Sequence, residues 1–102
     1  MSSIKIRTRQ IAEDTEIRLL ITHPMENGRN RDVNGVLIPA HFITELSLRL
    51  NQKPVINVNM AGSVAKNPFF SFHLKNLAAG DIISAHWTDN KQFSDSAELT
   101  IM

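Results

Sequence analysis

The chain has 102 residues, 42% of them hydrophobic and 21% charged, with no cysteine and a formal net charge of +1. We expect one domain over residues 1–102, and the composition excludes a disordered chain, disulfides and any thiol chemistry by this chain itself. The near-neutral charge, with no Lys/Arg cluster beyond Arg29 and Arg31, argues against a nucleic acid or a membrane surface as partner.

Alternation of apolar and polar residues predicts β-strands along most of the chain. In chain order the expected strands cover residues 4–9, 16–22, 42–50, 55–61, 69–75, 81–89 and a last stretch after a turn at 89–92. A long loop precedes the third strand, and within it Asn34-Gly35 is expected to close a small hairpin. Residues 62–68 are expected to break the regular structure.

Seven short strands without a helical pattern predict an all-β fold, an immunoglobulin-like antiparallel β-sandwich without a disulfide. Trp87, Phe70 and Phe72 are expected to centre its core. Strict alternation places Ile43 on the opposite face of its strand from Leu46.

Two turns stiffened by proline carry unusually large side chains. Pro24 and Pro39 stiffen the two ends of the loop that follows the second strand. Pro68 stiffens the second turn, which leads into Phe69. Aromatic residues and methionine are enriched in protein interfaces. The candidate partner-binding residues are therefore His23, Met25, His41, Phe42, Ile43 and Phe69.

An alternative function is copper binding by a small periplasmic β-sandwich, because His23 and Met25 offer imidazole and thioether ligands. Such a site needs His41 or Met60 to converge on them; otherwise both histidines hydrogen-bond loop backbone. Catalysis has little support, since neither a nucleophile elbow nor a phosphate-binding glycine loop is present. We therefore expect that the chain is not an enzyme, and that it has no cofactor and no catalytic residue.

Four segments carry a family resemblance: Thr22-His23-Pro24-Met25-Glu26-Asn27-Gly28, Pro39-Ala40-His41-Phe42-Ile43, Lys66-Asn67-Pro68-Phe69 and Trp87-Thr88-Asp89-Asn90. Together and in this order they resemble the SoxZ family, the small subunit of the SoxYZ sulfur carrier in bacterial thiosulfate oxidation. Asn27 stands where the family usually has Thr, a substitution that a turn tolerates.

The resemblance implies an immunoglobulin-like subunit in a tight heterodimer with SoxY. SoxY carries the reactive cysteine on a C-terminal arm, and the pair makes transient contacts with other Sox enzymes. The first residues do not form a signal peptide, which alone would favour the cytoplasm. The family is exported with a partner bearing a twin-arginine signal, so the resemblance implies a periplasmic location.

Overall fold

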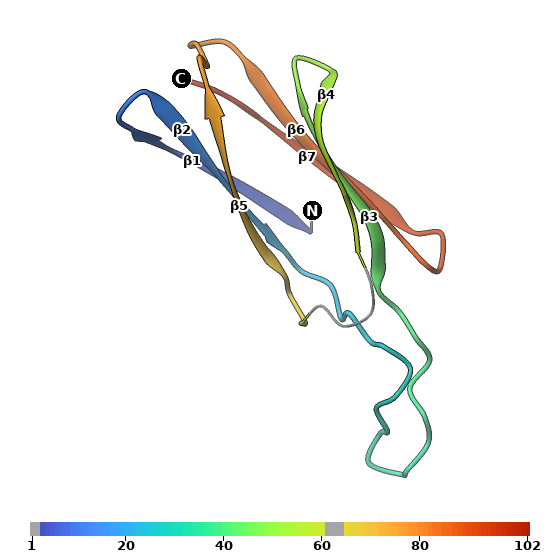
Figure 1. Ribbon diagram of the computed structural model, residues 1–102. Coiled ribbons are helices and arrows are strands. Elements are labelled where there is room, and N and C mark those ends of the chain that lie inside the picture. The colour runs from blue at the N-terminus through green and yellow to red at the C-terminus, as the bar shows by residue number, and fades with distance from the viewer. Residues whose placement is uncertain (1–2, 61–64) are drawn as a thin grey trace.

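The computed structural model describes residues 3–60 and 65–102, which form seven antiparallel strands in two sheets (Figure 1). The strands are β1 (Ile4–Ile11), β2 (Asp14–Ile21), β3 (Ile43–Leu50), β4 (Lys53–Asn59), β5 (Phe69–Lys75), β6 (Ile82–Asp89) and β7 (Ser94–Thr100). Their order is β1-β2-β5 in one sheet and β4-β3-β6-β7 in the other. The predicted all-β, immunoglobulin-like sandwich is confirmed.

The described residues contain no helix, and hence none with the length and hydropathy that crossing a membrane requires. The expected break at residues 62–68 falls partly outside the described residues, because residues 61–64 are not described.

The core lies between the sheets and is mainly aliphatic. Alternate residues of β2, β3 and β6 face inward, and the fully buried ones include Ile17, Leu19, Ile21, Leu46, Leu48 and Ile83. Trp87 is also buried, as expected. Phe70 and Phe72 are only partly buried and stack on each other along the margin of the core, with ring centroids 6.2 Å apart. They therefore do not centre the core, because branched aliphatic side chains fill the space between the inner faces.

Tight turns shift two strand ends from their expected positions. The β1–β2 turn lies at Ala12 and Glu13, so β2 begins two residues earlier than the sequence pattern indicated. The β3–β4 turn uses Asn51 and Gln52, both at positive φ (50° and 70°), which matches the twist of the strands they join.

A β-bulge at the start of β3 changes the direction of one side chain. Along β3–β6 the register shifts by one residue between Ile43 and Glu45, which leaves an extra residue in β3. Ile43 and Leu46, three positions apart, consequently both face the core, and Ile43 is fully buried. The expectation that Ile43 lies on the opposite face is wrong, since strict alternation does not survive a bulge.

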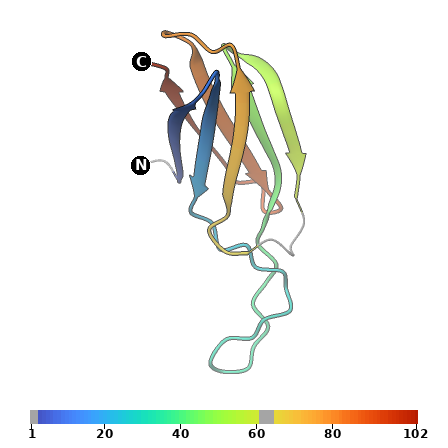
Figure 2. The same cartoon turned by 60° about the vertical axis from the view of Figure 1, so that its left-hand side comes forward.

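The loop between β2 and β3 projects from one end of the sandwich (Figure 2). Glu26 and His41 close its base through two backbone hydrogen bonds of 2.7 Å. The hairpin expected at Asn34-Gly35 is confirmed, because Arg31 and Leu37 form a bridge across it.

Candidate functional site

A buried carboxylate organises the base of the projecting loop. Asp89 is the last residue of β6 and is 2% exposed. Its Oδ2 accepts hydrogen bonds from Nε2 of His23 at 3.0 Å and Nε2 of His41 at 2.7 Å. Its Oδ1 accepts the backbone N–H groups of Lys91 and Phe93, each at 2.9 Å. We call His23, His41 and Asp89 the His–Asp–His cluster.

The cluster joins both ends of the loop to the β6–β7 turn. His23 follows β2, and its backbone N–H and C=O are both hydrogen-bonded to Asn67 at 3.0 Å. His41 precedes β3 and is paired with Glu26 across the loop base. One carboxylate thus fixes segments that are 66 and 48 residues away in the chain.

The hydrogen bonds of His23 define where its ring proton lies. The backbone N–H of Met25 donates to Nδ1 of His23 at 3.1 Å, so Nδ1 carries a lone pair. The neutral ring therefore holds its proton on Nε2, which donates to Asp89. Met25 adopts a positive φ of 49°, which is uncommon for a residue other than glycine. Its N–H donates to His23 and its sulfur accepts the N–H of Ile43 at 3.3 Å, so two hydrogen bonds hold the residue in this conformation.

Aromatic rings enclose the cluster. The His23 ring meets His41 edge-on at 4.6 Å and Trp87 edge-on at 5.0 Å, measured between ring centroids. The indole N–H of Trp87 donates to the Ser3 hydroxyl. The His41 side chain is 22% exposed and lies beside Phe93, so the cluster reaches solvent through His41.

Two opposing effects act on the pKa of Asp89. Burial raises it, since a charged carboxylate loses solvation in the interior. The hydrogen bonds from His23, His41, Phe93 and Lys91 together outweigh that effect, and the pKa lies below its ordinary value. Asp89 is therefore an anion whose charge is stabilised by four donors.

The candidate partner-binding residues fall into two groups. His23, Met25 and Ile43 are 3%, 5% and 0% exposed, so the chain's own atoms cover them. Phe42 and His41 are partly exposed, and Phe69 is 50% exposed. The residues of the first group pack inside the base of the loop, and those of the second group are accessible to another molecule.

The proposed copper ligands come together only in part. The two histidines converge, and with Asp89 they place three ligand atoms within 4.8 Å of one another. The Met25 sulfur, however, is engaged by the N–H of Ile43. The His23 Nε2 directs a proton, not a lone pair, at the centre of the cluster. This pattern is typical of a hydrogen-bonded structural cluster.

Asp89 is the member that sequence reasoning did not find. The sequence pattern places it at the start of a turn, where aspartate is common. The inward positions of β6, Ile83, Ala85 and Trp87, continue at Asp89 with the same spacing of two residues. That alternation is the signal that would have placed its side chain inside the sandwich.

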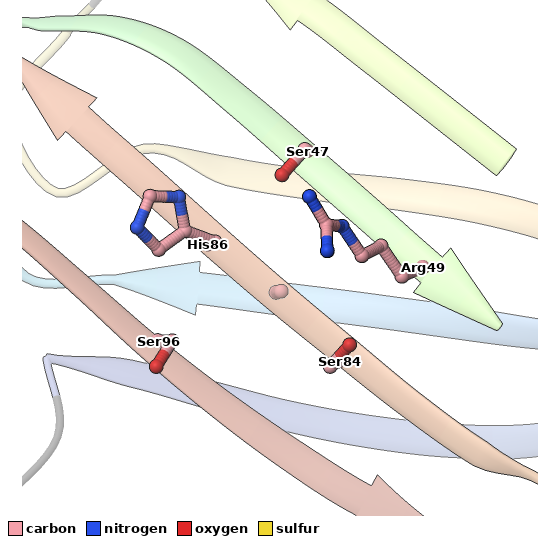
Figure 3. A pocket seen from close by; sticks show the side chains of 6 residues that line it. Ser47, Arg49, Ser84, His86 and Ser96 are labelled. Atoms are coloured by element: carbon pink, nitrogen blue, oxygen red, sulfur yellow. The ribbon is translucent and has the colours of Figure 1, made fainter. Parts of the chain in front are cut away.

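The outer face of β3, β6 and β7 holds a shallow hollow of about 370 Å³ (Figure 3). Short serine side chains leave this space open, and Arg49 and His86 lie at its sides. Glu98 lies opposite Ser84 on the neighbouring strand, so charges of both signs are present on this face. Nothing in this arrangement selects a charged ligand.

Residues 4–100 match one protein-family model, described as sulphur oxidation protein SoxZ. The match covers nearly the whole chain. The chain belongs to the SoxZ family. No curated protein matches it. SoxZ membership gives the chain a role in the SoxYZ system of sulfur oxidation and implies a SoxY-type partner.

The SoxZ match includes both the projecting loop and the β6–β7 turn. The His–Asp–His cluster thus lies entirely within the part of the chain that the SoxZ model covers. Both ring nitrogens of His23 and both carboxylate oxygens of Asp89 are engaged in hydrogen bonds, so the geometry favours a supporting role for these two residues.

Proposed function

We propose that this chain is the non-catalytic subunit of a periplasmic sulfur carrier, and that it binds and scaffolds a SoxY-type partner. The observation that carries the proposal is the SoxZ family match over residues 4–100. The partner's cysteine holds the sulfur intermediates of thiosulfate oxidation, because a thiolate is needed for that bond and this chain has no cysteine.

The loop base and loop tip form the surface that we assign to the partner. Phe93 is 60% exposed beside His41. At the tip, Val33, Val36 and Leu37 are 101%, 60% and 50% exposed. Apolar side chains that stand out from a soluble domain in this way are typical of protein interfaces. An obligate pair is expected to bury about 2,000 Å² or more.

The buried cluster has a defined part in this function. By joining the loop ends to the β6–β7 turn, it holds the loop in one arrangement before the partner binds. Less conformational entropy is then lost on association, and affinity rises. His23, Met25 and Ile43 therefore act as positioning residues, whereas Phe93 and the tip residues make contact.

Co-expression with a cysteine-bearing SoxY-type protein, followed by size-exclusion chromatography, tests the assignment. The two chains should elute together at micromolar concentration. The double variant Val36→Asp/Phe93→Asp should weaken association by about tenfold or more, because it places carboxylates in a desolvated interface. The control for the valine substitution is Val55→Asp on β4, which introduces one carboxylate at an exposed valine away from the loop and should leave association nearly unchanged. Separate elution of the unaltered chains would reject the proposal.

The periplasmic location has its own test. We expect osmotic shock to release the chain when it is co-produced with a partner that carries a twin-arginine signal. Replacing both arginines of that signal by lysine should retain both proteins in the cytoplasm. Release of this chain without the partner would contradict export as a complex.

A further inference from the structure

The outer face of the β1-β2-β5 sheet collects positive charge from three strands. Of the 11 Lys and Arg residues of the chain, five have side chains on this face, whereas only two of its 10 carboxylates do. The cations are Lys5, Arg7, Arg9, Arg18 and Lys75, and the carboxylates are Asp14 and Glu16. We call this surface the basic face, and Figure 2 shows its three strands side by side.

Strand pairing creates this face, so the linear sequence does not reveal it. The β1 cations alternate along one strand, and the antiparallel register brings Arg18 beside Arg7 and Lys75 beside Asp14. The expectation that no cluster exists beyond the loop pair Arg29 and Arg31 is therefore wrong.

The carboxylate at the middle of the face is already engaged. Glu16 contacts Arg9 at 3.3 Å, Arg18 at 3.8 Å and His73 at 3.6 Å. Lys5 and Arg7 form no ion pair with any residue of the described ranges 3–60 and 65–102. Positive charge is thus left without a partner at one end of the face.

The pairing of Arg7 with Arg18 is unfavourable for the isolated chain. These residues are directly opposite each other on neighbouring strands, and like charges at such positions destabilise a sheet. Arg18 also lies 5.8 Å from the centre of the Phe69 ring. A carboxylate from another molecule would relieve the repulsion, since two guanidinium groups can bind it with charge-assisted hydrogen bonds.

Apolar surface adjoins this charge. In the register, Lys5 pairs with Leu20 and Leu20 pairs with Phe69; the two apolar side chains are 41% and 50% exposed. A hollow of about 230 Å³ lies beside them, lined by Lys5, Leu20, Ile21, Thr22 and Asn67. A single apolar side chain of a partner could occupy this hollow while a neighbouring carboxylate meets Arg7 and Arg18.

We propose that the basic face docks an acidic protein surface that presents carboxylates next to an exposed apolar side chain. Glu16 and Asp14 favour a protein over a nucleic acid or a lipid surface, because a protein can match them with cations whereas a uniform layer of phosphates would be repelled. This inference does not depend on the loop surface, since Arg7, Arg18 and Leu20 lie on the sheet.

An acidic peptide provides the direct test. We would titrate the isolated chain with a synthetic peptide rich in Glu and Asp around one central Phe, and follow backbone amide shifts by NMR. Shifts should concentrate at Leu20, Phe69 and Ser71. Affinity should fall as salt is raised, because exposed charges are screened. The double variant Arg7→Glu/Arg18→Glu should weaken binding by about tenfold.

Two further variants keep this test decisive. Arg49→Glu makes the same kind of change on the outer face of the other sheet and should leave peptide affinity nearly unchanged. Arg7→Gln/Arg18→Gln removes the charges without adding new ones and should weaken binding by a smaller factor if the acidic variant fails to fold. Equal weakening by Arg49→Glu would overturn the proposal. So would equally tight binding to phosphatidylglycerol vesicles or to duplex DNA.

Discussion

Asp89 shows how a single buried anion can define a loop. It accepts four hydrogen bonds from groups that belong to three separate segments of the chain. Each donor would otherwise be left unsatisfied or would need water, and both outcomes loosen the loop base. At the scale of the residue, the arrangement of the loop therefore rests on a side chain that is buried inside the sandwich.

The first prediction concerns the substitution Asp89→Asn. The new amide group would face the Nε2–H groups of His23 and His41, and His23 cannot change tautomer without losing the Met25 hydrogen bond. We expect a loss of about 3 kcal/mol in the free energy of unfolding, measured by urea denaturation at unchanged m-value. Asp81→Asn, at a partly exposed carboxylate that accepts hydrogen bonds from Ala78 and Asn51, should change the midpoint far less; equal losses would contradict the role given to Asp89.

The free energy of unfolding should also depend on pH through the ionisation of Asp89. Its folded-state pKa lies below the ordinary value of 3.8, so its contribution is complete above that value and is lost as the pH falls through the folded pKa. We expect the free energy of unfolding to fall on acidification below about pH 4. In Asp89→Asn that decline should be shallower. Urea titrations across this range measure both, and parallel curves would be inconsistent with a lowered pKa.

A titration with Cu(II) tests the alternative function, copper binding, directly. Trp87 is the one tryptophan of the chain, and its ring lies 5.0 Å from that of His23, where a bound Cu(II) ion would quench its fluorescence. Because the His23 Nε2 carries a proton and the Met25 sulfur is engaged, we expect no stoichiometric quenching at micromolar Cu(II). Tight quenching that disappears in His23→Ala would support the metal site instead.

Much of this site could be predicted from sequence, and its centre could not. The large side chains on a stiffened loop single out His23 and His41, and the structure brings both rings to Asp89. Nothing local indicates that both rings meet Asp89, because that contact depends on how β6 lies across the sandwich. Tertiary packing, not spacing in the chain, brings the three together.

At the scale of the element, the projecting loop depends on glycine at its base. A Cβ on Gly28 would lie 3.3 Å from the Cβ of Ala40, at a φ of +84°. Gly35 has a similar φ of +79° with open space around it. We expect Gly35→Ala to cost about 1 kcal/mol for backbone strain alone, and Gly28→Ala to cost more through crowding. Thermal or urea unfolding compares the two, and equal losses would show that the contact with Ala40 is unimportant.

The strands themselves follow closely from the alternation of side chains, because one face of each sheet is buried. The bulge in β3 could not be predicted from this alternation, because residues 43–46 contain no glycine or other mark of an extra residue. With the bulge in place, Ile43 is fully buried and its N–H donates to the Met25 sulfur. Because of this one extra residue, the strand is predicted correctly but the side chain of Ile43 is assigned to the wrong face.

At the scale of the whole molecule, the sandwich separates its surfaces by character. The loop end presents apolar side chains, the β1-β2-β5 sheet presents cations, and the opposite sheet presents serines with charges of both signs. The absence of cysteine means that any sulfur bound covalently as a persulfide must be carried elsewhere.

We propose that this chain supplies a preformed contact surface while its partner carries sulfur. Native mass spectrometry of the co-expressed pair, before and after loading with thiosulfate by the oxidising enzymes, measures both parts at once. We expect a one-to-one complex in which the added sulfur mass is found only on the cysteine-bearing chain. Two unassociated chains, or a sulfur adduct on this chain, would contradict it.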